Sequence, residues 1–158
     1  MVSTLKLSDI TSKWRDTLKA SSAIQNYCNA KYSKSPNIYV GINGKSLPAN
    51  ADCPLIIIYP GAKSEGLESQ EFTYNLIVGW IIVQETSTTT EGVTEYTGVT
   101  ECDDLGQLIY QELAGLSTDN PISTVNYSIE PLAYYPRFPG RMDISIKITP
   151  ANGYTIGY

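Results

Sequence analysis

The sequence contains no histidine, and this absence excludes much of ordinary enzyme chemistry. Histidine is the most frequent general base and the most frequent metal ligand, and serine–histidine or cysteine–histidine catalysis depends on it. The glycine-rich motifs G-x-G-x-x-G and G-x-x-x-x-G-K-[ST], whose backbone amides hold phosphates, are absent too. We therefore expect no enzymatic activity, no catalytic residue, no cofactor and no bound metal.

Cysteine is scarce, since the 158 residues include only Cys28, Cys53 and Cys102. An odd number without C-x-x-C spacing argues against a disulfide framework and favours a reducing compartment. Each cysteine lies in or near an apolar stretch, which predicts a small buried side chain. No charged start followed by an apolar run opens the chain, and the longest apolar stretch, around 76–83, is too short to cross a bilayer. We expect a soluble protein made in the cytosol, without membrane contact.

Charged residues are few, at 17%, and the net charge is −5. A domain that grips nucleic acid normally presents a basic face, because neutralising phosphates supplies most of the affinity. The 11 Lys and Arg residues are spread over the chain, so we expect no such face and no tight nucleic-acid binding.

Phenylalanine is rare, with two residues, but tyrosine occurs 12 times. Tyrosine joins a large apolar ring to a polar tip, which suits a surface that is buried in a complex and hydrated when free. The alternative, that the tyrosines simply line strands, stays equally open.

Two helical segments are predicted from apolar residues at spacings of three and four. The first fills the N-terminal third, with Ser8 as its cap, a break at 21–22 and an end at Pro36. The second covers about 100–116. Its acidic residues Glu101, Asp103 and Asp104 would crowd the first turn, where the helix dipole favours negative charge; the alternative is a metal or acid–base cluster.

Five strands are predicted around these helices, at 37–42, 54–60, 70–85, 124–130 and 141–149. The segment 86–98, rich in Thr, Glu and Gly, is expected to be a mobile loop or a hairpin tip that orders on assembly. The order is then α-β-β-β-α-β-β in one domain, 1–158. This order predicts an α+β fold with a mostly antiparallel sheet of about five strands and helices packed on one face.

One segment and the order of elements resemble a known family. A helical segment leads to a strand of the form CP-apolar-YPG, here Cys53 to Gly61; a long amphipathic strand, an acidic helix start and two alternating strands follow. This resembles the tail terminator proteins of long-tailed bacteriophages, the lambda-type family, and related tail-completion proteins. The resemblance implies a structural virion protein, assembled in the host cytoplasm, that forms a hexameric ring. Such a ring caps the tail tube, ends tail polymerisation and joins the head connector, while DNA passes through it.

Six residues are the candidate contacts with a neighbouring subunit or with the tail tube. They are Glu85, Glu95, Tyr134, Tyr135, Arg137 and Arg141. The two glutamates flank the Thr-rich segment. The guanidinium groups of the two arginines can form paired hydrogen bonds with carboxylates of a neighbouring subunit. Two alternatives stay open: another head–tail connector or neck protein, and a small ligand-binding domain whose pocket is lined by the two tyrosines and two arginines.

Overall fold

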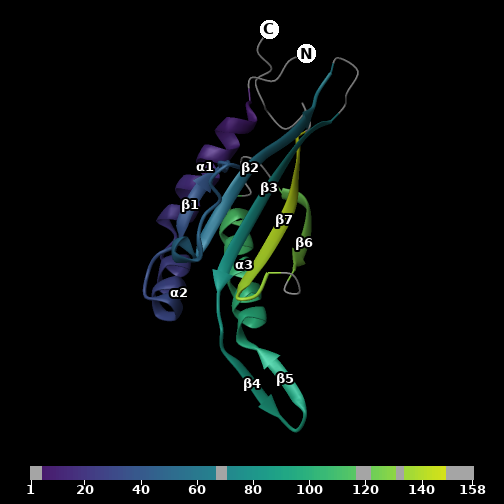
Figure 1. The fold of residues 1–158 in the computed structure, drawn as a ribbon. Coiled ribbons are helices and arrows are strands. Elements are labelled where there is room, and N and C mark those ends of the chain that lie inside the picture. Colours follow the sequence, from purple (N-terminus) through teal and green to yellow (C-terminus); the bar gives the residue numbers. More distant parts are fainter. Residues whose placement is uncertain (1–4, 67–70, 117–121, 131–133, 149–158) are drawn as a thin grey trace.

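A computed structural model describes residues 5–66, 71–116, 122–130 and 134–148 of the chain (Figure 1). It has three α-helices, a five-stranded sheet and a separate two-stranded hairpin. The fold is therefore α+β, as the sequence predicts. None of the helices in the described ranges is both long and apolar enough to cross a membrane.

The N-terminal helices are α1 (Leu7–Ala20) and α2 (Ser22–Tyr32), which meet at Ser21. Ser8 does not cap α1, contrary to the prediction: the helix starts one residue earlier, and the backbone N–H of Lys6 donates to the Asp9 carboxylate at 3.0 Å. Ser21 caps α2, since its hydroxyl accepts the N–H of Ile24 at 3.2 Å. The break that the sequence predicts between the helices is therefore real.

The main sheet has the strand order β1-β2-β3-β7-β6. Its strands are β1 (Asn37–Val40), β2 (Leu55–Ser64), β3 (Phe72–Val83), β6 (Ile122–Ile129) and β7 (Arg137–Ile148).

The sheet is mixed, which corrects the prediction of a mostly antiparallel sheet. β1 runs parallel to β2, whereas the other three neighbouring pairs are antiparallel. The connection between β1 and β2 contains the 3-10 turn η1 (Asn50–Asp52) and is long enough to bring the chain back to the end where β1 began. A tight turn at Asn43–Gly44 alone would have produced an antiparallel hairpin.

All three helices, including α3 (Thr97–Ala114), lie on one face of this sheet (Figure 1). Alternate residues of β3 face them and are buried, as the period of two predicts. Those residues are Phe72, Tyr74, Leu76, Val78, Trp80 and Ile82. The three cysteines are buried and unpaired, also as predicted.

Of the two alternatives predicted for 86–98, a mobile loop or a hairpin tip, the structure shows a hairpin of β4 (Ser87–Thr90) and β5 (Val93–Tyr96), and α3 already begins at Thr97. Glu91 and Gly92 take positive φ angles of 52° and 82°, which a tight hairpin turn with the right twist requires. Figure 1 shows the hairpin extending beyond the end of the main sheet. The element order is therefore α-α-β-β-β-β-β-α-β-β, with the hairpin inserted before α3.

Candidate functional site

The candidate site lies on the face of the sheet opposite the helices. Here Tyr59 of β2 and the apolar Ile77, Ile81 and Val83 of β3 are only partly buried, at positions where a fully solvated strand face would carry polar residues. One end of this face is covered by the connection from 41 to 54, which packs on a second small core around Cys53, Leu55 and Ile57. Beyond that cover the apolar surface stays open to solvent.

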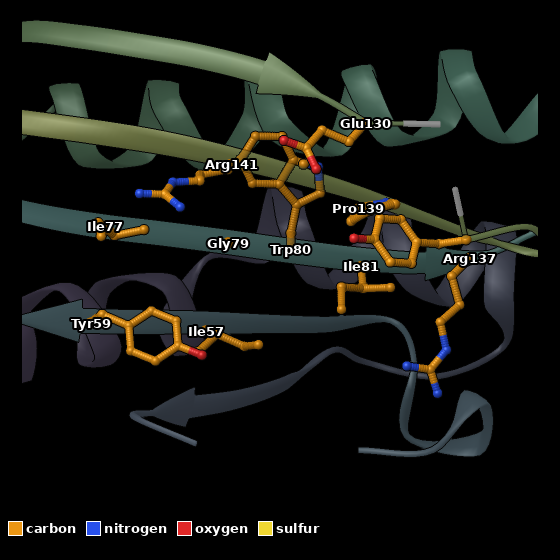
Figure 2. A pocket seen from close by; sticks show the side chains of 12 residues that line it. Ile57, Tyr59, Ile77, Gly79, Trp80, Ile81, Glu130, Arg137, Pro139 and Arg141 are labelled. Atoms are coloured by element: carbon orange, nitrogen blue, oxygen red, sulfur yellow. The ribbon is translucent and has the colours of Figure 1, made fainter. Parts of the chain in front are cut away.

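A groove of about 340 Å³ follows the middle of this open face (Figure 2). We call it the open-face groove; its lining residues are Ile57, Tyr59, Ile77, Gly79, Trp80, Ile81, Glu130, Tyr134, Arg137, Pro139, Gly140 and Arg141. Gly79 lies opposite Ile57 on β2 and opposite Arg141 on β7. Because Gly79 has no side chain, it leaves space in the groove that a larger residue at this position would fill.

The two arginines of the groove are on one strand, β7, which begins at Arg137. The predicted start of the last strand at 141 is therefore wrong, because β7 already includes Arg137. The two arginines are four positions apart, so both side chains leave the same face of the sheet. Figure 2 shows them at two ends of the groove, with Pro139 between them.

Both arginines already have partners within the chain. Arg141 forms a two-pronged pair with Asp143, with Nη2 to Oδ1 at 2.7 Å and Nε to Oδ2 at 3.0 Å. This hydrogen bonding raises the pKa of Arg141, and the guanidinium stays charged. Arg137 donates from Nη2 to the carbonyl of Pro48 at 2.9 Å and so holds the 41–54 connection on the sheet.

The structure brings together three of the six predicted contact residues and separates the other three. Tyr134, Arg137 and Arg141 meet at the open-face groove. Tyr135 instead packs its ring edge-on against Tyr96, with centroids 5.8 Å apart, and its hydroxyl donates to the carbonyl of Glu85 at 3.1 Å. Glu85 therefore lies at the base of the hairpin, and Glu95 lies on β5, opposite Thr88.

The hairpin is a second exposed surface, distinct from the groove. Every residue from Ser87 to Tyr96 is exposed, including the apolar Val93 at 60% and Tyr96 at 47%. A two-stranded hairpin without a packed face is only marginally stable in water. Within the described part of the chain, the hairpin therefore has no packed face of its own.

One residue with an unexpected environment is Glu101, which the sequence places in the solvated first turn of a helix. Helix α3 begins at Thr97, so Glu101 falls in the second turn and is only 5% exposed. Its carboxylate accepts hydrogen bonds from the Tyr32 hydroxyl at 3.1 Å and from Nε2 of Gln84 at 3.0 Å, with Nζ of Lys31 at 3.6 Å. The sequence does contain an indication of this burial. Glu101 precedes Leu105 by four residues and therefore lies on the apolar face of α3.

The Glu101 cluster joins three elements and is electrostatically satisfied. Burial and the nearby Glu101 carboxylate raise the pKa of Tyr32, which keeps its hydroxyl protonated as a donor. Within the described ranges, no group of three or more acidic or cysteine residues is arranged to hold a metal ion. The cluster is thus a structural join between α2, the end of β3 and α3.

No protein-family model matches this sequence, and no curated protein matches it either. The class that the fold itself defines is an α+β domain with one sheet face covered by helices and the other partly open.

Proposed function

We propose that this chain is a structural subunit that assembles with copies of itself into a closed ring at the end of a bacteriophage tail tube. The observation that carries the proposal is the pairing of an open apolar sheet face with a fully exposed hairpin in one small chain. Two different surfaces on one subunit permit head-to-tail contacts, and such contacts produce a ring when the rotation closes.

The tail-terminator assignment follows from the resemblance in the sequence. The segment Cys53 to Gly61 lies in and just before β2, beside the long amphipathic β3. A helix and two further strands, α3, β6 and β7, then complete the order. In this role the subunit contacts the tail tube protein on one side and the head connector on the other. It needs no cofactor and no tight grip on the DNA that passes through.

The proposal predicts concentration-dependent self-association, because a ring subunit must bind its own copies. Light scattering over a wide range of protein concentration is expected to show a mass rising from 17.3 kDa toward roughly six copies. Electron microscopy of that oligomer should show closed rings, and adding it to polymerising tube protein should shorten the tubes. A strictly monomeric chain at every concentration, without effect on tube length, would contradict the proposal.

The open-face groove also favours a second candidate, a small ligand-binding domain. Its volume of about 340 Å³ lies within the range of small-molecule sites, roughly 300–1,000 Å³. A ligand that binds only the folded state raises the melting temperature, and the rise grows with the logarithm of the ligand concentration once this exceeds the Kd. A specific shift of this kind, lost when Gly79→Val fills the groove, would favour this candidate over the ring. A head–tail connector would differ from a terminator in its binding partner. The tube-length measurement distinguishes the two roles, because a terminator is expected to shorten the tubes.

A further inference from the structure

The charges of the chain are segregated, contrary to the even spread expected from the sequence. Residues 6–34 contain six of the 11 Lys and Arg residues and only two acidic ones, Asp9 and Asp16. Residues 84–116 contain seven acidic residues and no Lys or Arg. The first segment is α1 and α2, and the second is the hairpin with α3. Lys31 and Glu101 satisfy part of this attraction within the chain. The exposed charges of α1 and of the hairpin remain, and they can attract copies of the same chain head to tail.

The basic segment borders a second groove, which we call the α1–β1 groove. It has a volume of about 370 Å³, and its lining includes Arg15, Leu18, Lys19, Gln25, Pro36 and Ile38. Lys19 is exposed, and so is Arg15, whose Nε also bonds Asp16 at 2.8 Å. The groove therefore offers an apolar floor beside two cations.

The free edge of the main sheet adjoins this groove. The N–H groups of Asn37 and Gly41 donate to β2, at 3.0 Å and 2.9 Å. Because successive residues of a strand direct their amides to opposite sides, Ile38 and Val40 direct theirs away from β2. No residue in the described part of the chain accepts these two bonds. An unpaired strand edge of this kind is a template for a strand from another chain.

The hairpin has the properties that this edge requires. β5 has four residues, as β1 has, and its outer edge is unpaired among the described strands. Val93 and Tyr96 supply apolar side chains, while Glu91 and Glu95 supply negative charge. Figure 1 shows the hairpin extending away from α1 and β1 of its own chain, so the complementary groove is that of another copy.

We propose that β5 of one copy pairs with the edge of β1 in the next copy, with Glu91 and Glu95 beside Arg15 and Lys19. This inference rests on the proposed ring and names the contact that closes it. The open-face groove suits the hairpin less well, because its two arginines already bind Asp143 and the 41–54 connection, whereas in the α1–β1 groove only Arg15 is paired and Lys19 has no ion pair with a described residue.

The first test exchanges the charges on the two surfaces. Glu91→Lys with Glu95→Lys, and separately Arg15→Glu with Lys19→Glu, are each expected to weaken self-association about tenfold or more. The variant with all four changes is expected to recover most of that loss, since the attraction is restored with reversed signs. Lys63→Glu with Lys147→Glu is the control, because it alters two cations of the same sheet away from both surfaces. Circular dichroism verifies that each variant is folded.

A second test does not depend on charge. The native cysteines are buried, so engineered surface thiols react selectively. Thr94→Cys mixed with Ser35→Cys is expected to form a disulfide-linked dimer, whereas Thr94→Cys mixed with Ser128→Cys on the opposite edge strand is not. If rings still form after both charge reversals and no such cross-link appears, the proposed β5–β1 contact is wrong but the proposed ring is not. A strictly monomeric wild type without the cross-link would overturn both.

Discussion

Glu101 shows how one side chain connects parts of the molecule that are distant in sequence. Its Oε2 accepts hydrogen bonds from Tyr32 of α2 and from Gln84 at the end of β3, while its own backbone belongs to α3. A buried carboxylate is costly unless hydrogen bonds replace its hydration, and here they do. The Gln84 contact also holds the residue that follows β3, three positions before the hairpin begins at Ser87.

Buried thiols predict a loss of stability in alkali. Burial raises the pKa of Cys28 and that of Cys102 from 9.0 to about 12. The unfolded chain releases these protons above about pH 9 and the folded chain retains them, so the contribution of the two thiols to the free energy of unfolding is constant below that pH and falls as pH rises toward 12. Each thiol contributes a slope of about 1.4 kcal/mol per pH unit. Urea denaturation at several pH values measures it, and Cys28→Ala should make the slope shallower; an equal slope would contradict this origin.

At the scale of elements, two glycines allow α3 to approach the sheet closely. Trp80 of β3 fills the space at Gly106 of α3 and at Gly140 of β7, and its Nε1 donates to the carbonyl of Cys102 at 2.8 Å. A Cβ added at Gly106 would lie 2.3 Å from the Trp80 ring and 2.2 Å from the Tyr127 hydroxyl. Small residues at these positions therefore determine the distance between helix and sheet.

Gly106→Ala is accordingly expected to destabilise the protein by about 1–3 kcal/mol through overpacking. Alanine favours an isolated helix by roughly 1 kcal/mol over glycine, so the clash must exceed that gain. Chemical denaturation measures the difference. Gly44→Ala is the matched control, because nothing lies within 4 Å of a Cβ there, and its effect should stay within about 0.5 kcal/mol. A stabilised Gly106→Ala variant would show that α3 packs differently.

The whole molecule is asymmetric, with one sheet face packed by helices and the other available for contact. A pair of four-residue strands buries too little area for a stable interface, which usually needs about 1,000 Å² or more. The open-face groove supplies further apolar surface for a neighbouring subunit. Its polar border, Arg141 with Asp143, is about half exposed, which is usual for the rim of an interface.

Arg141→Glu tests this use of the open face. The substitution places two carboxylates side by side where an ion pair stood, and the exposed pair itself contributes only about 0–1 kcal/mol to folding. We expect the monomer to stay folded by circular dichroism while ring formation, measured by light scattering, weakens. An unchanged distribution of oligomers would remove the open-face groove from the subunit contacts.

Elements whose stability is local or whose pattern is regular can be predicted from the amino-acid sequence alone. The apolar spacing of α1, α2 and α3, the alternation along β3 and the burial of the cysteines all followed from periodicity, because each depends on which face of one element meets the core. The chemistry of the residue types also selected Tyr134, Arg137 and Arg141 as candidate contact residues, and all three line the open-face groove.

Features that depend on pairing between distant segments cannot be predicted in this way and became visible in the folded chain. β1 runs parallel to β2 because the 41–54 connection returns the chain to the end where β1 began. The start of β7 at Arg137 depends on pairing with β3, since a proline-containing segment has little strand preference of its own. The burial of Glu101 required Tyr32 and Gln84 to arrive from other elements. Such features have their stabilising partners far along the chain, and a local pattern does not contain them.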